Sequence, residues 1–169
     1  NIFLKPVRRR YFIRFGTEFT TIMDENNEII LKRSSEIKVK GQNRYPIRLD
    51  EIVLYEEGVL MFKQINSELK KMSHVLKGSE IYISVSDFTA VMDIRPFEWA
   101  LRIAKPHSVS CVCESHSAFA YLNQKTGIES MLIININRDC VKFSIVNQYE
   151  IIYNKEEDFS DREETDDVR

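Results

Sequence analysis

The stretch YFIRFGTEFTTIMDENNEIIL, residues 11–31, decides the fold that the sequence predicts. Apolar and polar residues alternate up to Gly16-Thr17, a Thr-rich segment follows, and Asn26-Asn27 turn the chain back. Alternation with a period of two is typical of β-strands. The predicted strands are 11–15, 17–23 and 28–33. The first two form a hairpin with a small Gly-Thr loop, which is a loop type whose backbone N–H groups can approach a phosphate.

The rest of the chain mixes strands and helices. Further strands are predicted at 37–41, 81–86, 108–114, 131–137, 140–148 and 150–155. Apolar residues at helical spacing predict helices at 60–76, 94–104 and 116–125. Asp87 is the expected N-cap of the second helix, Trp99 lies on its apolar side, and Gly127 ends the third. This order predicts an α/β fold with a mixed sheet and flanking helices.

Length and composition exclude several classes of protein. With 169 residues, 43% of them hydrophobic, the chain can bury one real core. A formal net charge of −2 gives no reason to expect nucleic-acid binding. The cysteines Cys111, Cys113 and Cys140 lack a second pair at zinc spacing, so we expect free thiols in a reducing cytoplasm. No apolar run approaches the roughly 20 residues of a membrane span.

The two ends of the chain differ in charge. The leader NIFLKPVRRR, residues 1–10, places apolar residues before arginines. A frayed end or edge strand is one interpretation, and a weak anchor at the inner face of the membrane is the other. From Glu156 onward the chain is mostly charged. We therefore predict one domain over 1–155 and a flexible acidic tail over 156–169.

Two further segments contain residues with chemical potential. The segment IININRDCVKFSIV, residues 133–146, is a second strand–turn–strand unit, and an ordinary hairpin is its simplest interpretation. In CVCESHSAFAYL, residues 111–122, a strand ends at Glu114 and a helix follows. A carboxylate at this position can orient a water molecule, or it can simply accompany the capping residue Ser115.

Taken in order, these segments resemble the bacterial actin-like rod-shape family MreB, within the superfamily of actin, heat-shock chaperone ATPase domains and sugar kinases. Arg14-Phe15-Gly16-Thr17 stands where the family has D-x-G-T. Glu114 stands at the position of the water-orienting glutamate in the family's E-E-P-x-A-A-A segment, and residues 133–146 stand where the family has a D-x-G-G-G-T phosphate hairpin. The resemblance spans about residues 1–153, covers the first of the family's two large domains, and implies an actin-like, ribonuclease H-like domain I.

The departures from the family pattern remove the groups that the family uses for catalysis. Aspartates become Arg14 and Asn135, and an arginine has the wrong charge to hold a hydrated divalent cation. Glu114 without metal or clamp cannot drive phosphoryl transfer. The resemblance thus implies no catalytic residue, no metal site and vestigial phosphate loops at Arg14, Gly16, Thr17, Asn135, Asn137, Arg138 and Asp139.

The sequence therefore predicts a non-catalytic, half-length relative of the rod-shape family that acts through protein contacts. Expected partners are a second copy or the filament of a full-length actin-like protein, which this chain would cap or modulate. No cofactor is expected, with weak Mg-ATP binding as the open alternative. Two other readings stay open: an ATP-binding domain whose cleft needs a second domain or chain, and a decayed remnant that folds without a retained role.

Overall fold

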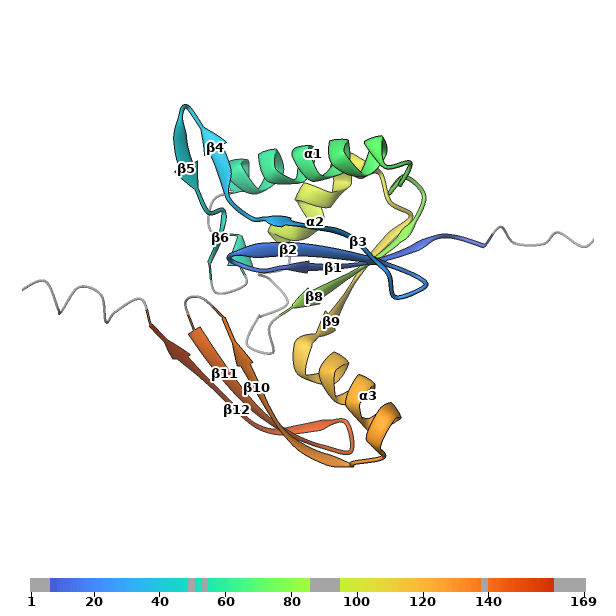
Figure 1. Cartoon of the computed structure of the whole chain (residues 1–169), viewed down its shortest axis with the longest axis vertical. Helices are drawn as coiled ribbons and strands as arrows, with labels where there is room; N and C mark the ends of the chain where they lie inside the picture. The colour runs from blue at the N-terminus through green and yellow to red at the C-terminus, as the bar shows by residue number, and fades with distance from the viewer. Residues whose placement is uncertain (1–6, 49–50, 53–54, 86–94, 138–139, 160–169) are drawn as a thin grey trace, which may run out of the picture.

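The chain folds into a larger five-stranded and a smaller three-stranded β-sheet, two additional two-stranded sheets and three α-helices, as a computed structural model shows for residues 7–48, 51–52, 55–85, 95–137 and 140–159. The larger sheet lies beside α1 and α2, whereas α3 and the smaller sheet lie together on its other side (Figure 1). The predicted cap Asp87, the residues Arg138 and Asp139, the leader up to residue 6 and the tail from residue 160 lie outside the described residues.

The larger sheet has five strands in the order β3-β2-β1-β8-β9. These strands are β1 (Arg10–Phe15), β2 (Phe19–Asp24), β3 (Ile29–Ser34), β8 (Glu80–Val85) and β9 (Ser108–Cys113). β1, β2 and β3 pair antiparallel, whereas β1, β8 and β9 run parallel, so the predicted mixed sheet is confirmed. Ile13 of β1 is in register with Ile22 of β2 and with Ile83 of β8, which aligns one apolar face across the sheet.

The core lies between this face and the helices α1 (Tyr55–Lys71) and α2 (Arg95–Leu101). Alternation places Tyr11, Ile13 and Phe15 of β1 inward, each at most 3% exposed. Phe62 of α1 and Phe97 of α2 are equally buried, and the Phe97 ring stacks on Phe15 with 5.0 Å between centroids. Burial of this apolar surface is the main force that fixes the helices on the sheet.

Helix α1 begins five residues before the predicted start at 60 and ends five before the predicted end at 76. Acidic Glu56 and Glu57 in its first turn suit the positive end of the helix dipole. At the other end Ser73 is left-handed (φ 63°), its N–H donates to Lys70 O, and His74 N donates to Leu69 O at 2.9 Å. This is a Schellman ending, which stops the helix although the apolar pattern continues.

Two other differences concern α2 and the loop after β3. Trp99, predicted on the apolar side of its helix, is 52% exposed, because Arg102 and Tyr55 hold its ring at the surface. The predicted strand 37–41 ends at Val39, where Lys40 and Gly41 both take positive φ. Such a pair is typical of a tight hairpin turn, which returns the chain as an additional short strand. The short strands are β4 (Ile37–Val39), β5 (Gln42–Arg44), β6 (Ile47–Arg48) and β7 (Glu51–Ile52).

The smaller sheet is an antiparallel meander of β10 (Ser130–Ile136), β11 (Cys140–Asn147) and β12 (Glu150–Asp158). It is connected to β9 through α3 (Glu114–Thr126), which ends as predicted at left-handed Gly127. β12 continues to Asp158, so residues 156–158 of the predicted flexible tail are in a strand instead. They pair with Cys140, Val141 and Lys142 of β11, and these backbone hydrogen bonds compensate for the charged sequence.

Candidate functional site

Arg14, near the end of β1, and Glu114, the first residue of α3, form the centre of the candidate site. The parallel pairing of β1, β8 and β9 brings the ends of these strands together, and α3 starts directly after β9. Arg14 Nε lies 3.0 Å from Glu114 Oε1. The Glu114 side chain is 12% exposed and that of Arg14 is 43% exposed. The Arg14 guanidinium therefore neutralises the Glu114 carboxylate directly.

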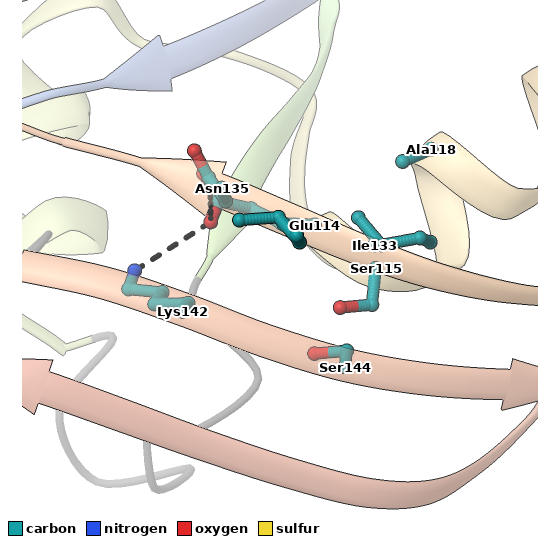
Figure 2. A pocket seen from close by; sticks show the side chains of 8 residues that line it. Glu114, Ser115, Ala118, Ile133, Asn135, Lys142 and Ser144 are labelled. Carbon is teal, nitrogen blue, oxygen red and sulfur yellow. Dashed lines mark hydrogen bonds and ion pairs between the residues drawn. The ribbon is translucent and has the colours of Figure 1, made fainter.

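The second carboxylate oxygen of Glu114 is held by the smaller sheet. Asn135 Nδ2 of β10 donates to Glu114 Oε2 at 2.9 Å, and Lys142 Nζ of β11 lies 3.6 Å from the same oxygen. Figure 2 shows both side chains reaching toward Glu114 from neighbouring strands. Because Asn135 and Lys142 are paired in register, they share the face of the sheet that meets α3. Lys142 is only 2% exposed, and a buried ammonium group requires such compensation.

The Gly-Thr loop is closed by hydrogen bonds of its own. Gly16 N donates to Phe19 O at 3.0 Å, and Gly16 O accepts from the Ser35 hydroxyl at 2.6 Å. A Cβ at position 16 would come within 2.6 Å of Phe19 O, which explains the glycine without reference to a ligand. Thr17 lies in the same loop. The Gly16 amide is thus engaged in the turn rather than turned toward an anion.

The turn between β10 and β11 is also closed internally. Asn137 N donates to Cys140 O at 2.9 Å, and Asn137 Oδ1 accepts from Arg14 Nη2 at 3.0 Å. The second contact joins the two hairpins that the sequence predicts at residues 11–23 and 133–146. Arg138 and Asp139, which complete this predicted loop, are outside the described residues.

A small cavity lies next to this cluster, between α3 and the smaller sheet (Figure 2). Its volume is about 240 Å³. Ligand pockets usually measure about 300–1,000 Å³, so this space is small for a nucleotide. The lining residues are Glu114, Ser115, Ala118, Ile133, Ile134, Asn135, Lys142 and Ser144.

The structure brings four of the predicted positions into direct contact: Arg14, Glu114, Asn135 and Asn137. We call this group, together with Lys142, the interhairpin cluster. Lys142 was missed by sequence reasoning. The alternation of β11 could have indicated it, because every second residue of a strand points to the same face. The residues of β11 on the buried face are Cys140, Lys142, Ser144 and Val146.

Charge determines what the interhairpin cluster can do chemically. Two cations, Arg14 and Lys142, face one carboxylate, Glu114. A hydrated divalent cation needs oxygen ligands of negative charge, and both oxygens of Glu114 already have partners. Within the described residues no group of three or more His, Cys, Asp and Glu side chains is placed to hold a metal ion.

Comparison of the sequence with known proteins gives no family. Protein-family models give no match, and a search of curated protein sequences also gives none. In the described part of the chain, no helix has the length and apolar character needed to cross a membrane.

Comparison of the structure gives clear matches. MreB5 of Spiroplasma citri bound to AMPPNP superposes with a TM-score of 0.77 at 15% identity, over 98% of this chain and 56% of that one. The ADP-bound form of the same protein superposes with a TM-score of 0.74 at 14% identity, over 90% of this chain and 52% of that one. The ethanolamine utilization protein EutJ from Carboxydothermus hydrogenoformans superposes with a TM-score of 0.64 at 12% identity, over 91% of this chain and 53% of that one. The fold is therefore the predicted actin-like α/β fold, and the chain spans about half the length of these proteins.

Proposed function

We propose that this chain is a non-catalytic actin-like module, related to the bacterial rod-shape family, that works through protein contacts. In this proposal the former nucleotide site has become a structural junction between the two hairpins. None of the three cysteines is in a disulfide, which agrees with action in a reducing cytoplasm. Its role would be to cap or modulate an actin-like filament, or to assemble with copies of itself.

The state of the Glu114 carboxylate is the observation that supports this proposal most. Catalysis of phosphoryl transfer depends on positioning and on neutralising the phosphate charge, usually with a metal ion. Here Arg14, Asn135 and Lys142 engage both carboxylate oxygens. The carboxylate would have to release these partners before it could orient an attacking water.

ATP turnover and thermal stability in Mg-ATP test the proposal. We expect a turnover rate equal to the blank, the same rate for Glu114→Gln, and a melting temperature unchanged by millimolar Mg-ATP. Binding at 100 times the Kd would instead stabilise the fold by about 2.7 kcal/mol, which a thermal melt detects readily. Turnover that disappears in Glu114→Gln would overturn the proposal.

A second candidate function is an ATP-binding half that another chain completes. It is favoured by one observation: two of the superposable structures hold ADP or AMPPNP, and this chain spans about half of their length. Under this alternative Mg-ATP raises the melting temperature of the chain, alone or with the chain that completes it. Under the leading proposal it does not.

The filament role has its own test. The chain is mixed with a full-length actin-like filament protein and sedimented, and filament length is measured by light scattering. We expect the chain to co-sediment or to shorten the filaments. A chain that stays in the supernatant and leaves filament length unchanged contradicts this role, although self-assembly would still be open.

A further inference from the structure

The buried ammonium group of Lys142 lies between carboxylates from two different elements. Glu114 of α3 is on one side, where its Oε2 is 3.6 Å from Lys142 Nζ (Figure 2). Glu156 of β12 is on the other side, because it is directly opposite Lys142 in the register of β11 and β12. Directly opposite residues of antiparallel strands share a face, and their Cβ atoms are about 5 Å apart. Both carboxylates are therefore within reach of the long Lys142 side chain.

The two carboxylates differ in their partners. Glu114 accepts hydrogen bonds from Arg14 Nε at 3.0 Å and from Asn135 Nδ2 at 2.9 Å. Lys142 is its most distant partner. Glu156 Oε1 is buried, and among the described residues it has no hydrogen-bond partner. A buried carboxylate oxygen without a donor is costly, so the carboxylate that needs the ammonium group more is the one that lacks it.

The surroundings of Lys142 leave room for its side chain to move. The cavity of about 240 Å³ beside the interhairpin cluster is lined in part by Lys142 and Ser144. Asn154, opposite Ser144 on β12, carries a second buried oxygen, Oδ1, for which the described residues supply no donor. Protein interiors are usually close-packed, and buried oxygens without donors are rare enough that each needs an explanation.

We propose that Glu156 is a second acceptor for Lys142, and that the ammonium group moves between Glu114 and Glu156. The inference deepens the proposed function, on which it rests, by giving the junction between α3 and the smaller sheet a second state. With Lys142 on Glu114, the ion pair ties the smaller sheet to α3. With Lys142 on Glu156, the ion pair lies within the smaller sheet.

The second state avoids the main cost of opening a buried ion pair. Separation of such a pair normally leaves one charge buried without compensation. A lysine has a flexible stem and three donors, so Lys142 can exchange one carboxylate for the other and stay paired. Asn135 is then the remaining contact of β10 with Glu114. A partner protein that engages Glu114 would in this way loosen the smaller sheet from α3.

A double-mutant cycle on the full chain tests the exchange by urea denaturation. Glu114→Gln and Glu156→Gln each leave Lys142 one carboxylate, whereas the two together leave it none. We therefore expect the unfolding equilibrium constant of the double variant to exceed the additive expectation about tenfold. In a Lys142→Met background the two substitutions should be additive. Glu157→Gln is the matched control, because Glu157 is the neighbouring residue on the exposed face of β12, and it should be additive with Glu114→Gln.

The position of the Lys142 side chain can also be observed directly. In the Glu114→Gln variant, nuclear Overhauser contacts from the Lys142 Cε protons to the Glu156 Cγ protons should become stronger than in the unmodified chain. This measurement needs only the single variant, so it decides the matter even where the double variant does not fold. Circular dichroism establishes that each variant is folded.

Two results would overturn the inference. The first is an additive double variant, which is expected if water molecules in the cavity satisfy Glu156. The second is a Lys142 side chain that keeps its position in Glu114→Gln. Either result in a chain without ATP turnover removes only the exchange between carboxylates. ATP turnover by a chain that shows the exchange removes only the proposed function.

Discussion

The two sheets of this molecule are held in different ways. The five-stranded sheet packs α1 and α2 over a core that buries one face of β1, with Tyr11, Ile13 and Phe15. The three-stranded sheet meets α3, whose buried residues are only Ser115 and Phe119, and gains the polar contacts of the interhairpin cluster. Apolar packing thus stabilises the five-stranded sheet, whereas a few polar contacts hold the three-stranded sheet in position beside it. Substitutions in the two regions should therefore have different costs.

The largest expected effect is in the first sheet. Phe62→Ala removes a fully buried ring from α1 and should lower the free energy of unfolding by about 3–5 kcal/mol. Phe143→Ala, which removes a partly buried ring from the smaller sheet, should cost less, about 1–2 kcal/mol. Urea denaturation at low protein concentration measures both. Equal costs would remove the distinction between the two sheets.

The next effect concerns the buried charge of the second sheet. Glu114→Ala removes the carboxylate that lies 3.6 Å from the buried Lys142 ammonium, which should cost about 3 kcal/mol. Adding Lys142→Met, which replaces the ammonium with an apolar group, should recover most of the loss. A double-mutant cycle from denaturation curves measures the coupling. Additive costs for the two substitutions would show that the pair does not stabilise the junction.

The smallest effect is expected at the exposed part of the interhairpin cluster. Arg14→Ala removes contacts to Glu114 and Asn137, but the Arg14 side chain is 43% exposed, so the cost should be about 1 kcal/mol. Hydrogen exchange at the Asn137 amide should become faster. Arg10→Ala is the control, since its ion pair with Glu80 stays within the first sheet. Equal exchange in both variants would mean that Arg14 does not join the hairpins.

Much of the fold could be predicted because it depends on local pattern. Strand alternation located β1, β2 and β3 to within two residues, and Gly127 marked the end of α3. The end of α1 could not be predicted, because a left-handed Ser73 stops the helix while the apolar spacing continues. The exposure of Trp99 depends on its contact with Tyr55, more than forty residues away in the sequence.

The candidate site could be predicted only as a set of positions. Ordered motifs identified Arg14, Glu114, Asn135 and Asn137, and the structure places them in contact. Their contacts could not be predicted, since they depend on how α3 and the second sheet sit beside the ends of β1 and β9. Lys142 could not be identified by a motif because it lies in the middle of β11. Only its position on the buried face of the strand distinguishes it from a surface lysine.

The hydrogen bond from Arg14 to Asn137 has a consequence for how long an assembly of this chain would last. In a protein whose hairpins meet around a nucleotide, binding and hydrolysis can change the junction and so limit how long an assembly lasts. Here the hairpins meet through side chains of the chain itself. In the function we propose, an assembly built from this chain would form and dissolve with protein concentration alone, and its lifetime would not depend on the cell's supply of ATP.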